Sequence, residues 1–331
     1  MKIENISIKR NSCTGDVYNI GAGGRSLLNI GRGSYIENLS VNSDVIPNIH
    51  IGKFSTIKEN VTFRLPSNNF YNRITTSDDQ HVALPAGIVI CDPFVVKGQI
   101  IIQNDVWIGE NSIIKGGVTI KNGAIIEPNS YVTEDVLPFT IMSGNPAKII
   151  GHRFSEKQIA ELQNIAWWEW SNELLEKRKA DFALPIQTFI DKYKATDTSI
   201  AARKDPENRC ILLFPDFGLS DSLWKRVMNE YCELCSTGAD IGQLYIQLYN
   251  SANTDSNIKE LQDFFSQFDE DTGDIVVHIG KESDDLPLFE TASHYVTTRE
   301  PRTVYHSCLA DRFGVNMLSG IDMPNIFGAL L

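Results

Sequence analysis

A six-residue repeat over residues 96 to 136 constrains the fold of this 331-residue chain more than any other feature. Steps of six from its first residue reach seven aliphatic side chains without exception: Val96, Ile102, Ile108, Ile114, Ile120, Ile126 and Val132. Small or aliphatic residues lie four positions after each of them: Ile100, Val106, Ser112, Val118, Ala124, Ser130 and Val136. Neither a helix, with a period of about 3.6, nor a strand, with a period of about 2, sustains this spacing. The repeat predicts a solenoid whose stacked coils turn their aliphatic residues inward.

A weaker form of the same repeat covers residues 1 to 63 and is interrupted around residues 42 to 50. In this part Ile51 is followed six positions later by Ile57. Residues 64 to 94 then break the period with a polar segment that contains three prolines. Because coils fix both ends of this long irregular insertion, we interpret it as a projecting functional loop.

A helical tail is predicted over residues 155 to 193, after the repeat has ended at Asp135. Ser155 and Gln158 have the spacing of a capping box, and Ser171 can cap a second helix. Three tryptophans lie between these two helices: Trp167, Trp168 and Trp170. We interpret them as a hydrophobic plug that docks the tail on a coil end; the alternative is direct stacking on a ligand.

Residues 209 to 331 change to an alternation of strands and helices. Strands are predicted at residues 211–214, 244–248, 275–279 and 295–296. Helices are predicted at residues 223–234, 258–268 and 286–293. This alternation predicts a parallel sheet of βαβ units, and hence a Rossmann-like α/β domain. The polar segment 195 to 208 is typical of a linker, so residues 1 to 195 form the first domain.

The net charge of −12 comes from the second half of the chain. Residues 197 to 331 hold 22 acidic and 10 basic residues, which leaves 20 of the 42 acidic and 20 of the 30 basic residues for the first half. Duplex affinity depends largely on Lys and Arg, so we expect no nucleic-acid partner. The N-terminus has no signal-length apolar run and no stretch is long enough for a membrane span, so we expect a cytoplasmic protein.

The six cysteines are sparse and irregularly spaced, which favours reduced thiols over a disulfide framework. Four residues could supply zinc ligands: Cys232, Cys235, His306 and Cys308. The first two fall on a predicted amphipathic helix, where cysteines more often are small buried side chains. We therefore predict no metal, with a zinc site as the open alternative.

Three motifs in the first domain resemble the left-handed β-helix acyltransferases. They are the stretch from Asn104 to Gly109, the turn Asn145-Pro146-Ala147-Lys148, and the tail from Arg153 to Trp170. The tail narrows the resemblance to the xenobiotic acetyltransferase branch, which includes sugar and polysaccharide O-acetyltransferases. The resemblance covers residues 28 to 193. It implies a left-handed parallel β-helix, a homotrimer, and transfer of acetyl from acetyl-CoA to a hydroxyl of a sugar or polysaccharide.

The same resemblance implies a set of CoA-binding residues. The groove for the pantetheine arm would be lined by Gly117, Ala124 and the neighbourhood of Ser130, next to the retained Trp107. Lys148 and Arg153 would meet the CoA phosphates. The alternative is that the small residues are required by coil corners and that the two cations are surface charges.

The general base departs from the family pattern. The family's loop opens with a sequence close to Gly-Asn-His-Arg whose His is the base, and Asn69 takes that position here. An amide cannot accept a proton near neutral pH. One alternative base is His81, with Asp79 to fix its tautomer. A second is His50 or His152 from a neighbouring subunit, and a third is no base at all, with Asn69 only orienting the acceptor.

Three functions therefore remain open at this point. The first is an acetyl-CoA-dependent O-acetyltransferase with an atypical base. The second is a catalytically silent trimeric scaffold or glycan-binding protein on the same fold. The third is a bifunctional enzyme, because the second domain faintly resembles the nucleotide-binding half of two-domain glycosyltransferases. In the first two the second domain is a candidate module for acceptor or partner recognition, and in the third it would transfer a sugar.

Overall fold

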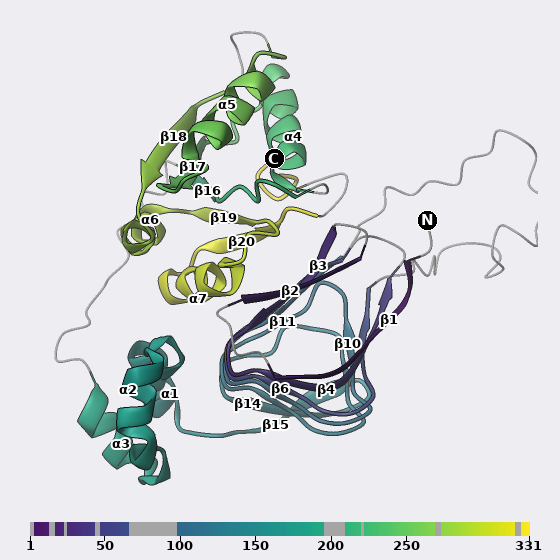
Figure 1. Ribbon diagram of the computed structural model, residues 1–331, viewed down its shortest axis with the longest axis vertical. Helices are drawn as coiled ribbons and strands as arrows, with labels where there is room; N and C mark the ends of the chain where they lie inside the picture. The colour runs from purple at the N-terminus through teal and green to yellow at the C-terminus, as the bar shows by residue number, and fades with distance from the viewer. Residues whose placement is uncertain are drawn as a thin grey trace, which may run out of the picture.

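The computed structural model describes residues 3–12, 17–22, 25–43, 47–65, 98–194, 209–219, 222–268, 273–321 and 326–331. Figure 1 looks along a stack of coils that form a triangle, here called the coil unit. Beside it lie a group of helices, called the tail, and a sheet with helices from residues 209 to 331, called the second unit.

Fifteen strands of the described chain build the coil unit: β1 Ile3–Ser12, β2 Val17–Ala22, β3 Arg25–Gly31, β4 Tyr35–Ser43, β5 Asn48–Ile51, β6 Thr56–Ile57, β7 Val61–Arg64, β8 Gln99–Ile102, β9 Trp107–Ile108, β10 Ile113–Lys115, β11 Thr119–Ile120, β12 Ile125–Ile126, β13 Tyr131–Val132, β14 Thr140–Gly144 and β15 Ala147–His152. One sheet has the order β11-β8-β5-β3-β2. The other wraps two sides, because β4 pairs with β6 through Tyr35 and with β7 through Leu39. Successive coils pair in parallel.

The predicted inward series forms the core of the coil unit. Ile108 lies on Ile126 and Ile114 on Val132, each three hexapeptides apart, so aliphatic side chains stack in columns. From Ile100 to Val136 the residues of both series are at most 3% exposed. The prediction of inward-facing side chains is confirmed for these residues, while Val96 lies outside the described part. Such columns share one continuous core, which is why no coil is stable alone.

The corners of the coils form three rows, and all the residues named below except Gly116 have a left-handed backbone. The first corner row contains Gly33, Phe54, Asp105, Gly123 and Phe139; the second contains Asn60, Asn111 and Asn129; the third contains Gly116 and Gly117. Backbone hydrogen bonds of 2.7–3.0 Å join neighbours along each row. Glycine is required at position 123, because φ is +69° and a Cβ there would lie 2.4 Å from the Phe139 ring.

The third corner row marks where the irregular insertion leaves the coils. The N–H of Gly116 donates to the carbonyl of Arg64, and the N–H of Gly117 donates to that of Gln99. Arg64 and Gln99 belong to the last described strand before the insertion and the first one after it. Residues 66–97, with most of the predicted loop, lie outside the described residues.

The tail consists of α1 Glu156–Ile165, η1 Trp167–Glu169, α2 Asn172–Arg178, η2 Lys179–Ala183 and α3 Ile186–Tyr193. The capping box of Ser155 and Gln158 is present, and Ser171 caps α2, as predicted. Trp168 is buried in a cluster with Phe139, and the Trp167 ring lies 5.0 Å from that of Phe54. The hydrophobic plug is confirmed, but it packs on the first corner row and not on a coil end, because these phenylalanines project from corners.

The second unit is a five-stranded parallel sheet with the order β18-β17-β16-β19-β20. Its elements are β16 Cys210–Leu213, α4 Trp224–Ser236, β17 Gln243–Tyr249, α5 Thr254–Phe265, β18 Ile275–Gly280, η3 Glu282–Asp284, α6 Asp285–Thr291, β19 His294–Thr297, α7 Thr303–Phe313 and β20 Asn316–Ser319. Apolar clusters cover both faces of the sheet. The predicted strands and helices are all present, whereas α7 and β20 were not predicted.

The second unit packs on the coil face built by β3, β5 and β8. The carbonyl of Thr298 accepts a hydrogen bond from Asn48 Nδ2 at 3.1 Å, and Arg299 Nη1 donates to the carbonyl of Pro47. On α7, Asp311 pairs with Lys121 at 2.6 Å. These contacts bury polar groups from both units, and the groups named here are paired across the interface.

His50 lies at the centre of this interface and is fully buried. Its Nδ1 is 3.0 Å from the amide nitrogen of Asn29, and its Nε2 is 2.8 Å from Asn48 Oδ1. An amide nitrogen can only donate, so Nδ1 accepts and Nε2 carries the proton of a neutral imidazole. Burial, with the nearby charge of Arg299, lowers the pKa of His50 to about 3.

The pKa of His50 predicts acid sensitivity. The folded state keeps His50 neutral, while the unfolded state protonates it below a pKa of about 6.5. Its contribution is therefore complete above that value, and it falls by about 1.4 kcal/mol per pH unit as the pH drops toward about 3. Urea unfolding of the wild type and of His50→Gln at several acidic pH values measures this. Equal pH slopes for the two proteins would contradict the buried neutral imidazole.

Candidate functional site

The predicted CoA-binding residues do not lie at one corner of a single coil unit. Trp107 and Ala124 are adjacent, because the N–H of Trp107 donates to the carbonyl of Ala124 at 3.0 Å. Ser130 lies beside the second corner row, where its hydroxyl accepts from the N–H of Gly144 at 3.2 Å. Gly117 lies on the third row, with φ of +86°. One chain therefore brings together the first pair but separates it from Ser130 and Gly117.

The two predicted phosphate-binding cations differ in environment. Lys148 is exposed on β15 and forms a surface ion pair with Glu134 at 3.2 Å. Arg153 binds Asp105 at 2.9 Å and the carbonyl of Gly123 at 2.8 Å, and its guanidinium lies over the Phe139 ring. Arg153 thus secures the tail on the first corner row. Lys148 remains available to a ligand, because binding would break only a weak surface ion pair.

The candidate bases are only partly described. Asn69, Asp79 and His81 lie outside the described residues. His50 is buried under the second unit, which prevents it from serving a neighbouring subunit while the interface is formed. His152 is exposed on β15, with its Nδ1 3.3 Å from the hydroxyl of Thr140.

The candidate zinc ligands are dispersed. Cys232 and Cys235 lie on α4, where Cys232 belongs to an apolar core. His306 and Cys308 lie on α7, and Cys308 contacts the amide of Asn122 in the coil unit. Among the described residues no three His, Cys, Asp or Glu side chains form a group able to hold a metal ion.

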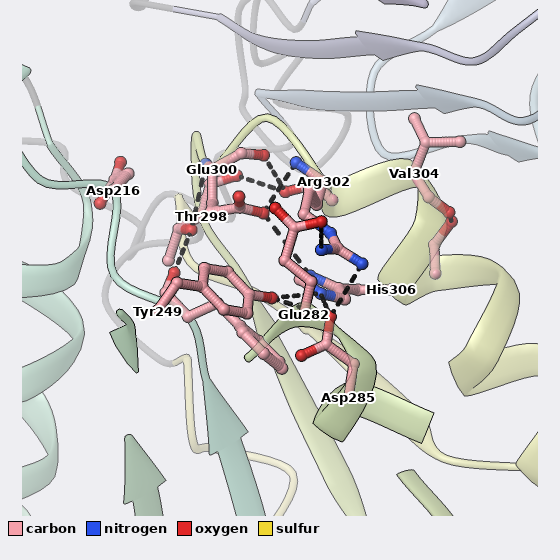
Figure 2. Close-up of polar contacts among 12 residues, drawn as sticks. Asp216, Tyr249, Glu282, Asp285, Thr298, Glu300, Arg302, Val304 and His306 are labelled. Atoms are coloured by element: carbon pink, nitrogen blue, oxygen red, sulfur yellow. Dashed lines mark hydrogen bonds and ion pairs between the residues drawn. The ribbon is translucent and has the colours of Figure 1, made fainter. Parts of the chain in front are cut away.

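Polar side chains gather at the carboxyl ends of the parallel strands of the second unit (Figure 2). They are Asp216, Tyr249, Asp285, Glu300, Arg302 and His306, here called the strand-end cluster. The sheet order places β16 between β17 and β19, so consecutive connections leave on opposite sides of β16. Open α/β sheets bind ligands at such a point, outside the carboxyl ends of the strands.

Asp285 is the centre of the strand-end cluster. Its Oδ2 accepts a hydrogen bond from the Tyr249 hydroxyl at 2.8 Å and lies 3.0 Å from His306 Nε2. The same oxygen pairs with Arg302 Nη2 at 3.1 Å. One fully buried carboxylate therefore holds Tyr249 at the end of β17 together with Arg302 and His306 at the start of α7.

Burial sets the protonation states in this cluster. It raises the pKa of Glu300 to about 8, so this carboxyl is mainly protonated at neutral pH. Burial also lowers the pKa of His306, whose Nδ1 faces Glu300 Oε2 at 3.6 Å. Asp216, whose pKa burial raises to about 6, instead accepts backbone N–H groups that include the start of α4. The buried acids thus position α7 and Arg302. The side chain of Arg302 is 22% exposed and reaches the surface beside Glu282.

Sequence reasoning missed this cluster, apart from His306 as a possible metal ligand. A usable signal was present, because Asp216, Tyr249 and Asp285 each end or closely follow a strand that the sequence does predict. Glu300 and Arg302 follow the fourth predicted strand in the same way. The carboxyl ends of parallel strands meet at one edge, which is the rule that would have gathered them.

Comparisons with known proteins match the hexapeptide repeats of the coil unit. The family described as bacterial transferase hexapeptide (six repeats) matches residues 99–134. A probable macrolide acetyltransferase of Lysinibacillus sphaericus is 43% identical over 133 residues, 37% of this chain and 70% of that protein. A chloramphenicol acetyltransferase of Klebsiella aerogenes is 36% identical over 146 residues, 43% of this chain and 67% of that protein.

Solved structures of similar proteins include a hexapeptide-repeat acetyltransferase of Vibrio cholerae complexed with acetyl coenzyme A. It is 25% identical, covers 37% of this chain and 72% of that chain, and has a TM-score of 0.22. Within the described residues, no helix has the length and apolar character needed to cross a membrane.

Proposed function

Because this chain belongs to the hexapeptide-repeat acetyltransferases, we propose that it transfers an acetyl group from acetyl-CoA to a hydroxyl of a sugar or polysaccharide. The observation that carries the proposal is the repeat itself, stacked in columns and matched in relatives that are acetyltransferases. The acceptor class comes from the sequence resemblance to the sugar O-acetyltransferase branch.

The chemistry needs few protein groups. The acceptor oxygen attacks the thioester carbonyl, a C–O bond forms, the C–S bond breaks, and CoA leaves as its thiolate. A base must take the hydroxyl proton as attack proceeds. In this proposal His81 is that base, Asp79 orients its ring, and Asn69 orients the acceptor.

The geometry of the corners supports a CoA groove away from the tail. The tail covers the first corner row, whereas the asparagines of the second row are exposed. Corner rows present backbone N–H and C=O groups in a straight line, which suits an extended pantetheine arm. The groove in this proposal runs beside Ser130 or Gly117, with Lys148 near the phosphates.

A homotrimer is part of the proposal. Leu137, Ile149 and Ile150 are more than half exposed, and the last two lie on β15 at the edge of its sheet. An exposed apolar edge strand is a surface that a second copy can cover. Light scattering measures the mass, and a monomer would contradict this part. Since acetyl-CoA is the donor, a cytoplasmic location is proposed with it.

We propose that residues 209–331 are a Rossmann-like domain that recognises the acceptor or a partner. Parallel pairing throughout the sheet and helices on both faces support this proposal. A glycosyltransferase activity, the bifunctional alternative, has no further observation in its favour.

A second candidate acceptor comes from the relatives. The two named above are described as macrolide and chloramphenicol acetyltransferases, so a hydroxylated antibiotic is an alternative to a sugar. A hydrophobic pocket discriminates between such acceptors only through differences in their apolar surface and in their hydrogen-bonding groups.

The test of the proposed function is release of free CoA thiol from acetyl-CoA. We expect calorimetry to show acetyl-CoA binding, and thiol release to depend on an acceptor chosen from sugars, glycans and chloramphenicol. The absence of acetyl-CoA binding would rule the function out. Binding without turnover on any acceptor would favour the catalytically silent scaffold.

A further inference from the structure

A cavity of about 1030 Å³ lies where the coil unit, the tail and the second unit meet. The coil corners at Gly31 and Gly52 form one wall, Gln163 of α1 a second, and Tyr305 of α7 a third. Its volume is at the upper end of the range for small-molecule sites. The predicted loop leaves the coils from the third corner row, so this cavity at the first row is a separate place.

The walls of the cavity carry more cationic than anionic charge. Lys53 and Arg302 line it, and they are neutralised by Glu169 and Glu282 at 2.6 and 2.5 Å. The third carboxylate of the lining, on Asp311, pairs with Lys121.

Two further arginines line the cavity without a carboxylate partner in the described part of the chain. Arg32 donates to Asn172 Oδ1 at 3.1 Å and to backbone carbonyls of the tail, which leaves its positive charge uncompensated. Arg312 is exposed, and its guanidinium lies 5.5 Å from the centre of the Phe313 ring. Two arginines in the lining of one cavity favour an anion, since their planar donors fit carboxylate and phosphate oxygens.

Two buried polar atoms of the lining also lack a hydrogen-bond partner among the described residues. They are Nε of Arg32, a donor, and Oδ1 of Asn29, an acceptor on a side chain that is 6% exposed. Leaving such groups unpaired is unfavourable. A ligand that satisfies both must offer an acceptor to Arg32 and a donor, such as a hydroxyl, to Asn29.

We infer that this cavity binds a small hydroxylated anion of the size of a sugar acid or a sugar phosphate. The anionic group lies between Arg32 and Arg312, and a hydroxyl reaches Asn29. The strand-end cluster borders this site, because Asp285 forms an ion pair with Arg302, which lines the cavity (Figure 2). The inference concerns a second binding site and does not depend on acetyl transfer.

Calorimetric titration of the full chain with glucuronate, glucose 1-phosphate and glucose tests the site. We expect at least one of the anions to bind, with glucose at least about tenfold weaker, and the preferred anion distinguishes carboxylate from phosphate. Arg32→Gln and Arg312→Gln should each weaken binding of the anion by about tenfold or more. Lys259→Gln, which removes an exposed cation of α5 outside the cavity, should leave affinity unchanged.

Several results would overturn the inference. They are no binding of either anion, equal binding of glucose, or unchanged affinity in Arg312→Gln, which is exposed and should not disturb folding. Competitive displacement of the anion by coenzyme A would also overturn it, because the cavity would then be part of the CoA groove.

Discussion

Replacing His81 with alanine is expected to lower the rate of acetyl transfer by about a hundredfold or more, the usual effect of removing a general base. The acceptor hydroxyl would keep its proton during attack, so kcat should fall while acetyl-CoA binding is retained. Thiol release under saturating acetyl-CoA measures the first quantity, and calorimetry measures the second. The two measurements together distinguish loss of the general base from loss of acetyl-CoA binding.

The matched control is His278→Ala, a histidine on β18 in the second unit, which should leave turnover unchanged. Asn69→His should restore the family's base and raise turnover if the groove is otherwise intact. Unchanged turnover in His81→Ala would eliminate this residue as the base. Loss of turnover in His152→Ala instead would move the base to β15.

Replacing Arg299 with alanine is expected to destabilise the chain by about 3 kcal/mol, because a buried charge-assisted hydrogen bond is lost and a carbonyl is left unpaired. Arg299 is 3% exposed and donates to the carbonyl of Pro47, while its own carbonyl accepts from Asn29 Nδ2 at 3.4 Å. The loss should appear in chemical unfolding. Amide hydrogen exchange should also rise in β5, whose face the second unit covers.

Lys259→Ala is the control for the change in charge, since this exposed lysine on α5 lies away from the interface. We expect it to change stability by less than about 0.5 kcal/mol. If Arg299→Ala behaves like the control in both measurements, the two units do not pack together in solution as described.

The coil core was predictable because its signal is local and periodic. Each step of six reaches the equivalent inward position on the next side of the triangle, and three steps return to the same side, so Ile108 and Ile126 point inward whatever packs outside. The capping residues Ser155 and Ser171 were predictable for the same reason, since a cap bonds only to the next turn of its own helix. In the second unit the buried strands were found from short apolar runs.

One helix of the second unit was missed for an identifiable reason. The buried side of α7 includes Thr303, His306 and Ser307, so its sequence lacks the apolar stripe by which helices are found. His306 is buried beside Asp285 and Glu300, and the hydroxyl of Ser307 accepts from Gln103 of the coil unit, so the partners of these residues come from outside the helix. Its polar face became interpretable only with the strand-end cluster in place.

The candidate site also has some features that depend on local sequence and others that depend on tertiary contacts. The sequence determined the repeat, the helix caps of the tail and the run of tryptophans between its helices, because each depends on residues near one another in the chain. Only the tertiary structure decided that the tail covers the first corner row, that His50 is buried beside Arg299, and that Arg32 and Arg312 line the same cavity. Those contacts join residues far apart in sequence, and no local period records which distant surface will exclude water from a side chain.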